Sequence, residues 1–279
     1  MIFGEDIKNK AKKIKVENKS KKLHFKEICS KKLVVGSLLL GFLYFFTRLY
    51  HLTILPIFCD EAIYIRWAQI IGNEPTLRFI PLTDGKQPLF MWLIAILLKA
   101  GKDPLFTGRF VSVLAGFLEI LGLGYLSALI FKKKRVVFLS MLVYLISPFN
   151  LFFNRMALVD GLLSAFITWS LIFVILLGKE IKIKWAILLG FCLGLGWLTK
   201  SPAMFFICLA PFLVISVAIK EKKTHFKKIP FCLKLLFLTG GALVLAFLIY
   251  NILRLDQSFH MIALRNKDYV WPISEILKH

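Results

Sequence analysis

The chain has 279 residues, of which 58% are hydrophobic, and it carries a formal net charge of +21. Ordinary globular chains are about 45–50% apolar, and a soluble monomer with such an excess would expose large apolar patches. The apolar residues occur in long runs separated by short polar stretches, so the composition excludes an ordinary soluble domain and predicts a membrane protein.

The N-terminal segment 1–32 is a basic tail with few large apolar residues between Lys8 and Lys32. Such a tail is typically solvated, and beside a membrane it can contact anionic lipid headgroups. Most other basic residues lie in short stretches between apolar runs, which argues against a nucleic-acid partner. No small-residue cleavage site follows the first apolar run, so we expect that run to remain as a membrane anchor.

Apolar runs long enough to cross a bilayer follow the tail. We expect about seven membrane-spanning helices, at roughly 33–51, 109–131, 136–153, 159–177, 185–199, 203–219 and 231–250. A further run, Pro88–Leu98, is too short to cross comfortably and is interpreted as a half-helix or interfacial segment. The predicted fold is therefore an all-α polytopic bundle over 33–250, followed by a segment on the outer side over 251–279.

The basic residues between the runs predict the orientation. If the N-terminus is cytoplasmic and Pro88–Leu98 does not cross, the tail and the basic stretches near 132–135, 179–184 and 220–228 all lie inside, as the positive-inside rule requires. The loop 52–108, the turn near 154–158, the turn at Lys200 and the residues after Tyr250 then share the outer side. We therefore predict a multi-pass plasma-membrane protein whose functional groups face away from the cytoplasm.

The acidic residues divide in the same way. Those expected at the outer side are Asp60, Glu61, Glu74, Asp84, Asp103 and Asp160. Glu119 is the exception, because it lies inside a predicted span. An acid at that depth is a functional candidate, although beside the small residues Gly122 and Gly124 it can instead pair two helices.

The outer loop predicts a short amphipathic helix on the membrane surface. Its apolar residues at helical spacing are Ile63, Trp67, Ile70 and Ile71, and Gly72-Asn73 is a plausible stop. Asp60 is expected at the N-cap of this helix. On spacing alone, Asp60 need only cap the helix and Glu61 need only favour its positive end.

Three other polar features lie on the same predicted side. They are Lys86 in Asp84-Gly85-Lys86-Gln87, Arg155 with Asp160, and Lys200 in a tight turn. Each has an ordinary explanation, since a lysine at the rim of an apolar segment usually snorkels toward water. Lys86 could equally hold a phosphate at the depth of the lipid headgroups.

In combination, these features resemble the GT-C superfamily of glycosyltransferases, in the branch of protein O-mannosyltransferases and lipid A aminoarabinose transferases. The matching segments are Asp60-Glu61, Lys86-Gln87-Pro88-Leu89, Gly108-Arg109-Phe110, Arg155…Asp160 and Leu198-Thr199-Lys200-Ser201-Pro202. Gln87 replaces a Pro of the family pattern, and Ser201 replaces a Gly. Members of this branch are usually longer, so the resemblance predicts a truncated chain.

The resemblance implies an enzyme of cell-envelope glycosylation that moves a hexose or pentose from a polyprenyl-phosphate donor to a hydroxyl of a lipid, glycan or protein, with inversion. It implies Asp60 as the catalytic base, with Glu61 in support. The cations expected to bind the donor phosphate are Lys86, Arg155 and Lys200.

Asp160 and Asp84 are expected to shape the site or to help hold a divalent metal. Some GT-C enzymes use such a metal and others do not, and no other cofactor is implied.

Two other functions remain open on the sequence. A transporter or lipid flippase would explain the spans and Glu119, although transporters usually carry internal repeats and polar residues at the bilayer midplane. An inactive, truncated partner subunit would retain donor binding without catalysis.

Overall fold

The structure of the chain is a computed structural model that describes residues 31–101, 103–222, 229–267 and 275. The basic tail predicted over 1–32 and the last basic loop near 220–228 therefore lie almost wholly outside the described residues. The described part is helical and contains no strand, which confirms the all-α prediction.

The elements follow one another with short connections. The α-helices are α2 (Lys31–Leu49), α3 (Cys59–Asn73), α4 (Leu89–Leu98), α5 (Pro104–Phe131), α6 (Lys134–Ile146), α7 (Pro148–Phe153), α8 (Val159–Glu180), α9 (Ile183–Thr199), α10 (Ala203–Lys222), α11 (Ile229–Tyr250) and α12 (Met261–Lys267). The 3₁₀-helices are η1 (Pro75–Leu77), η2 (Ile80–Asp84), η3 (Asn251–Leu255) and η4 (Gln257–His260).

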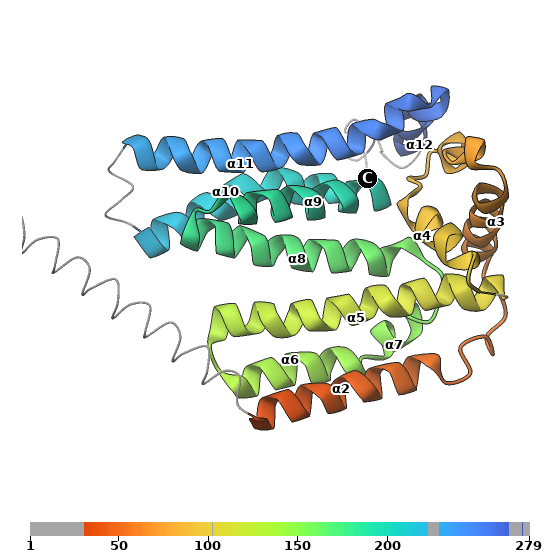
Figure 1. Cartoon of the computed structure of the whole chain (residues 1–279), viewed down its shortest axis with the longest axis horizontal. Coiled ribbons are helices and arrows are strands. Elements are labelled where there is room, and N and C mark those ends of the chain that lie inside the picture. The colour runs from red at the N-terminus through yellow and green to blue at the C-terminus, as the bar shows by residue number, and fades with distance from the viewer. Residues whose placement is uncertain (1–30, 102, 223–228, 268–274, 276–279) are drawn as a thin grey trace, which may run out of the picture.

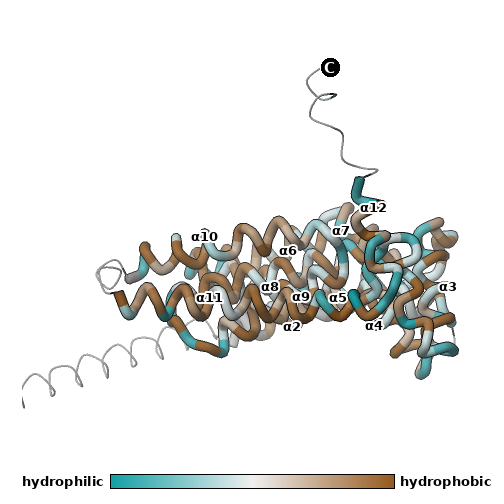
Figure 2. The backbone as a smooth tube through the Cα atoms, turned by 90° about the horizontal axis from the view of Figure 1, so that it is seen from above, coloured by the Kyte–Doolittle hydropathy of each residue, from teal (hydrophilic) through white to brown (hydrophobic). Residues whose placement is uncertain are grey.

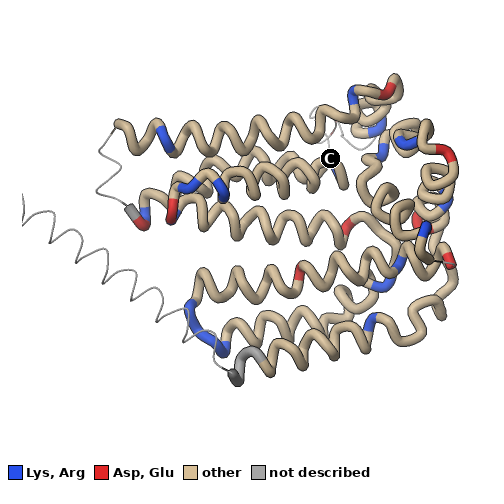
Figure 3. The backbone as a smooth tube through the Cα atoms, in the orientation of Figure 1, with Lys and Arg blue, Asp and Glu red and all other residues tan. Residues whose placement is uncertain are grey.

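The long helices form a bundle with two different ends. Helices α2, α5, α6, α8, α9, α10 and α11 run side by side along the long axis, and α3, α4 and α12 gather at one end, here named the α3–α4 end (Figure 1). The opposite end carries the α5–α6 and α8–α9 turns. The helices of the bundle are mostly hydrophobic along their length (Figure 2), and charged residues concentrate toward both ends (Figure 3).

Four described helical segments are long and apolar enough to cross a membrane. They are Pro104–Phe131, Val159–Glu180, Ala203–Glu221 and Ile229–Leu255. Shorter apolar helices occur at Val35–Leu49, Leu89–Leu98 and Ile183–Thr199. The chain therefore has the helices of a membrane protein, and the predicted total of about seven spans stays a prediction.

The span expected over 136–153 is divided into two helices, α6 and α7. The break lies at Ser147-Pro148, because proline disfavours helical geometry in the residue before it. The Ser147 hydroxyl accepts a hydrogen bond from the Asn150 amide and so caps α7. With 13 residues, α6 is about 20 Å long, shorter than a hydrocarbon core of about 30 Å.

Helix α5 begins at Pro104, five residues before the expected start of that span. Asp103 caps it by accepting a hydrogen bond from the Leu105 amide at 3.0 Å, and proline fits the first turn. The early start places Arg109 inside the second turn of a helix, whereas the apolar pattern predicts only the beginning of a span at this position.

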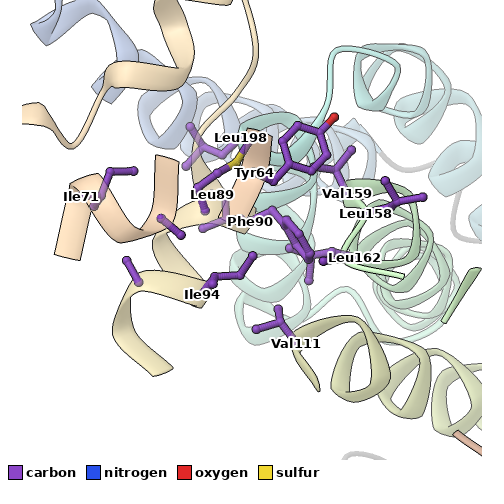
Figure 4. Packing of buried hydrophobic residues seen from close by; sticks show 14 of the residues in the cluster. Tyr64, Ile71, Leu89, Phe90, Ile94, Val111, Leu158, Val159, Leu162 and Leu198 are labelled. Atoms are coloured by element: carbon purple, nitrogen blue, oxygen red, sulfur yellow. The ribbon is translucent and has the colours of Figure 1, made fainter. Parts of the chain in front are cut away.

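Helix α4 packs against α3 at the α3–α4 end. Its 10 residues span about 15 Å, too short to cross a bilayer, in agreement with the interpretation of Pro88–Leu98. Phe90, Met91 and Ile94 of α4 are fully buried. They pack with Tyr64 of α3 and Leu162 of α8 in one apolar cluster (Figure 4), which anchors the α3–α4 layer to the bundle.

Glu119 lies at mid-length of α5 and bonds to neighbouring helices. Its carboxylate accepts hydrogen bonds from Tyr144 of α6, at 2.9 Å, and from Ser164 of α8. Tyr144 in turn bonds to Asn154. These contacts favour the helix-pairing interpretation of Glu119 over a separate functional site.

Candidate active site

Helix α3 presents a buried carboxylate on its inner face. The buried residues of the helix are Glu61, Tyr64, Ile65, Ala68 and Ile71, at helical spacing, whereas Ile63, Trp67 and Ile70 are only partly buried. The face that is buried against the protein therefore lies a fraction of a turn away from the apolar face expected from the sequence, and it includes a glutamate. The expected contact of the apolar face with the membrane surface stays a prediction.

The N-cap of α3 is Phe58, so the expectation of Asp60 as N-cap was wrong. Glu61 provides the hydrogen-bond acceptor at the start of the helix, because its Oε2 accepts a hydrogen bond from the Phe58 amide at 3.0 Å. Asp60 lies one position earlier, and its side chain is 46% exposed. Asp60 is thereby left available for other partners.

Glu61 and Arg109 form an ion pair from which water is fully excluded. Both side chains have zero exposure, and the Arg109 Nε and Nη2 atoms donate to the two carboxylate oxygens at 2.9 Å each. Arg109 Nη1 also donates to the backbone oxygens of Leu52 and Leu55, and Nη2 donates to that of Pro56. Such a two-pronged contact fixes the loop before α3 against the start of α5.

A third segment is held by the same carboxylate. The Ala157 amide donates to Glu61 Oε1 at 2.7 Å, which fixes the turn that leads into α8. Burial alone raises the pKa of the Glu61 carboxyl, but the hydrogen bonds from Arg109, Ala157 and Phe58 outweigh it and hold the pKa below its ordinary value. Glu61 is therefore a charged hub that joins three parts of the chain.

Arg109 was not among the predicted site residues. Gly108-Arg109-Phe110 is one of the segments that resemble the family, but the sequence predicts no role for it. A signal was present, because an arginine within an apolar helix requires a partner. The identity of that partner could not be read locally, since Glu61 is 48 residues away.

Lys86 lies between two carboxylates and two aromatic rings. Its Nζ is 3.3 Å from Asp60 Oδ1 and 3.7 Å from Asp84 Oδ2. It also lies 4.8 Å from the ring centre of Tyr64 and 5.8 Å from that of Trp67. The lysine side chain is 17% exposed, so it is a well-positioned cation that still reaches the surface of the α3–α4 end.

Lys200 and Asp160 form a second pair at the same end, with Nζ and Oδ1 separated by 2.7 Å. Lys200 follows the last residue of α9, and Asp160 lies in the first turn of α8. Both side chains are about half exposed, at 41% and 52%. Their surface position makes the pair weak as a structural contact and accessible to a ligand.

Tyr64 connects the two pairs electrostatically. Burial raises the pKa of the Tyr64 hydroxyl, and the negative charges of Asp60 and Asp160 raise it further. The loops that carry Lys86 and Lys200 are in direct contact, because Gln87 Nε2 donates to Ser201 Oγ at 2.7 Å. Four predicted site residues, Asp60, Lys86, Asp160 and Lys200, therefore lie around one region of the α3–α4 end.

Arg155 is oriented differently. Its Nη2 donates to the backbone oxygens of Tyr50 and His51, at 2.9 and 2.8 Å, just beyond the end of α2. It therefore stabilises a helix C-terminus, and no contact joins it to Lys86 or Lys200 within the described residues. The predicted role of Arg155 in phosphate binding stays a prediction.

Asp84 is held by α12 and by Lys86. Arg265 Nη1 forms an ion pair with the Asp84 carboxylate and donates to the Asp84 backbone oxygen at 2.7 Å. The next residue, Gly85, has φ of +65°, and a Cβ atom there would lie 2.7 Å from the Met261 oxygen of α12. The turn before Lys86 therefore needs glycine both for its conformation and for its contact with α12.

The site holds no cluster of metal ligands among the described residues, and one cavity lies beside it. The carboxylates of Asp60, Asp84 and Asp160 are each paired with a lysine or arginine, and nowhere in the described part of the chain do three His, Cys, Asp or Glu side chains gather as metal ligands. The donor set therefore does not fit the divalent metal considered from the sequence. A cavity of about 280 Å³ lies beside Asp84, between η2 and α12, slightly below the usual size of a ligand pocket.

Comparison with known proteins links the part of the chain from α4 to α11 to a family. The sequence model of one family, described as dolichyl-phosphate-mannose-protein mannosyltransferase, matches residues 85–250. The match starts at Gly85, beside Lys86, and includes Arg109, Asp160 and Lys200. A search of curated proteins and a search of solved structures each gave no match.

Proposed function

The chain belongs to the dolichyl-phosphate-mannose-protein mannosyltransferase family, and from this premise we propose that it moves a sugar from a polyprenyl-phosphate donor to an acceptor hydroxyl, with inversion. The reaction is proposed to occur at the outer face of the membrane. The acceptor class is a lipid, a glycan or a protein.

One observation carries this proposal: two lysine–aspartate pairs reach the surface at one end of an apolar helical bundle. A donor with a polyprenyl tail cannot leave the bilayer, so its phosphate must be met at the membrane surface. Lys86 and Lys200 are cations in such a position, and a lysine ammonium is a suitable partner for phosphate oxygens. The apolar surfaces of the neighbouring helices supply a route for the tail.

The chemistry follows from the same groups. Asp60 accepts the proton of the acceptor hydroxyl as the hydroxyl oxygen attacks the anomeric carbon. The bond from the anomeric carbon to the phosphate oxygen breaks at the same time, and its electron pair leaves with the phosphate. Lys86 and Lys200 stabilise the charge that develops there. Attack on the face opposite the leaving group inverts the anomeric centre.

Asp60 and Lys86 must exchange partners for this reaction. Without donor, Lys86 neutralises Asp60 at 3.3 Å. A donor phosphate would draw the ammonium away and leave the Asp60 carboxylate free to accept a proton. Donor binding and base activation are therefore proposed to be one event.

Glu61 is proposed as a positioning residue, because its carboxylate is fully buried and both of its oxygens are engaged by Phe58, Arg109 and Ala157. By holding the start of α3 against α5 and the turn before α8, the Glu61–Arg109 pair sets the positions of Asp60 and Asp160. Its contribution to the reaction is thus geometric.

The test is release of free polyprenyl phosphate, in intact membranes, from a donor that is labelled in its polyprenyl chain. Wild-type membranes should release it only when an acceptor is present. Asp60→Asn should slow release about 10²–10⁴-fold, the range of a lost general base, with unchanged membrane insertion. The matched control is Asp256→Asn, because the Asp256 carboxylate caps η4 by accepting a hydrogen bond from the Ser258 amide at 2.8 Å.

Each outcome of this test is informative. Transport of intact donor without release would indicate a flippase, and binding without release would indicate an inactive partner subunit. Wild-type turnover in Asp60→Asn would refute the base assignment.

A further inference from the structure

A buried amide joins the two loops that carry the site lysines. The Gln87 Nε2 atom donates to Ser201 Oγ at 2.7 Å, and the Gln87 side chain also forms a hydrogen bond with Tyr250. Gln87 is 4% exposed. A buried amide is costly without partners, so its bonds are expected to be maintained.

The location of this contact gives it significance. Gln87 directly follows Lys86, and Ser201 directly follows Lys200. Each of the two residues is followed by a proline, which restricts the backbone. Gln87 and Ser201 are also the positions at which the sequence departs from the motifs that it resembles, so the two departures contact each other across 114 residues.

The segments on both sides of the Gln87–Ser201 hydrogen bond are packed against the bundle. The rings of Trp197 and Tyr250 are stacked, with centroids 3.8 Å apart and planes within 6°. Leu89 of α4 and Leu198 of α9 are buried in the same apolar cluster (Figure 4). The hydrogen bond therefore connects two segments that are each already fixed to the bundle.

We propose that Gln87 and Ser201 are positioning residues that hold Lys86 and Lys200 at a fixed separation, so that both ammonium groups act on one phosphate. The nature of this ligand rests on the proposed function. The connection between the two loops does not, and it can be tested separately.

The first experiment measures trypsin cleavage in the loop that does not carry the substitution. Trypsin cleaves after Lys86 and after Lys200, and the tight loops should protect both bonds in the folded protein. Ser201→Ala should accelerate cleavage after Lys86, and Gln87→Leu should accelerate cleavage after Lys200, each about five-fold for one lost hydrogen bond. Ser201→Thr, which keeps the hydroxyl, should restore protection. Ser216→Ala is the matched control, because that hydroxyl bonds within α10.

The second experiment measures binding of a sugar-free polyprenyl phosphate to the full chain in lipid nanodiscs. Ser201→Ala and Gln87→Leu should each weaken binding about five-fold, and the double variant should lose less than the product of the two single losses. Both substitutions remove the bond between Gln87 and Ser201, and each also removes a second bond, between Gln87 and Tyr250 or between Asn266 and Ser201. In transfer assays, the KM for the donor should rise while kcat changes little.

These results separate the two proposals. If the wild type binds polyprenyl phosphate without transferring sugar, the transferase proposal fails and the positioning role stands. Acceleration of cleavage only at the substituted loop, or additive losses of binding, would overturn the positioning role. If the wild type does not bind the phosphate, the role as stated fails together with the donor assignment.

Discussion

The two ends of the bundle carry charges of different kinds. At the α3–α4 end, the ion pairs join distant segments: Glu61 to Arg109, Asp60 to Lys86 and Asp160 to Lys200. At the opposite end, Lys182 pairs with Glu180, two residues away, at 2.8 Å. Lys184 lies 4.2 Å from the ring centre of the adjacent Trp185.

This difference indicates how charge is used in the two regions. Lys132–Arg135, at the α5–α6 turn of the opposite end, are exposed, as expected of residues that face water and lipid headgroups. One longer contact, Lys179 to Glu221 at 3.6 Å, connects α8 and α10 there. Charges that only meet solvent need no distant partner, whereas charges that build a site must be brought together by the fold.

The largest expected effect comes from breaking the buried pair. Arg109→Met leaves the Glu61 carboxylate buried without its cation, which should cost about 3–5 kcal/mol of stability. The measurement is thermal unfolding of the purified protein in detergent, together with the yield of folded protein. Arg135→Met, at the exposed opposite end, should change stability by less than about 0.5 kcal/mol. Equal losses in both variants would remove the distinction between the two ends.

A second prediction concerns the pH dependence of the stability that the Glu61–Arg109 pair contributes. The folded-state pKa of Glu61 lies below its ordinary value of 4.5, so its contribution to stability is present above pH 4.5 and is lost as pH falls through the lower, folded pKa. The unfolding temperature should therefore fall as the solution is acidified below pH 4.5. In Glu61→Gln, stability at neutral pH should be lower and this acid-dependent loss should be smaller. An identical acid dependence in both proteins would contradict the depressed pKa.

These two predictions concern what the sequence could not reveal. The all-α fold, the short α4 and the gathering of charged residues follow from local patterns that a single sequence contains. The partners of Glu61 do not, because a buried glutamate and a surface glutamate look alike until Arg109 is brought to it. Arg155 and Lys200 both look like cations at the rim of a span, yet one binds backbone carbonyls and the other an aspartate.

Two helix boundaries could have been predicted from the sequence. Asp103-Pro104 is an ordinary helix start, and it would have placed Arg109 within α5. Pro148 would have divided the expected span 136–153. In both cases a signal that begins or ends a helix interrupts the pattern of the apolar run. The start at Asp103-Pro104 matters for the site, because it places Arg109 where it pairs with Glu61.

A third prediction concerns the donor. Lys86→Ala should raise the KM for the polyprenyl-phosphate donor at least about ten-fold, since hydrogen bonds to charged groups contribute about 1.5–3 kcal/mol. Initial rates over a range of donor concentrations give this value. Lys133→Ala, at the opposite end, should leave the KM unchanged. An unchanged donor KM in Lys86→Ala would argue against its phosphate role.

The smallest expected effect is at the local pair of the opposite end. Lys182→Ala removes an exposed contact between neighbouring residues and should change stability by about 0–1 kcal/mol. Transfer activity should be retained in full. A large loss of activity would show that the opposite end also takes part in the reaction.

The central claim is that Asp60 and Asp160 share one face of the membrane, opposite the basic α5–α6 turn. Labelling with a membrane-impermeant maleimide tests it directly, because Cys59 is exposed beside Asp60 and serves as a native probe. In a Cys29→Ser background, Cys59 should label from outside intact cells. With Cys59 also replaced by Ser, an introduced Asp160→Cys should label from outside intact cells, and Lys133→Cys should label only after the membrane is opened. Labelling of Cys59 and of Asp160→Cys from opposite sides would contradict the account.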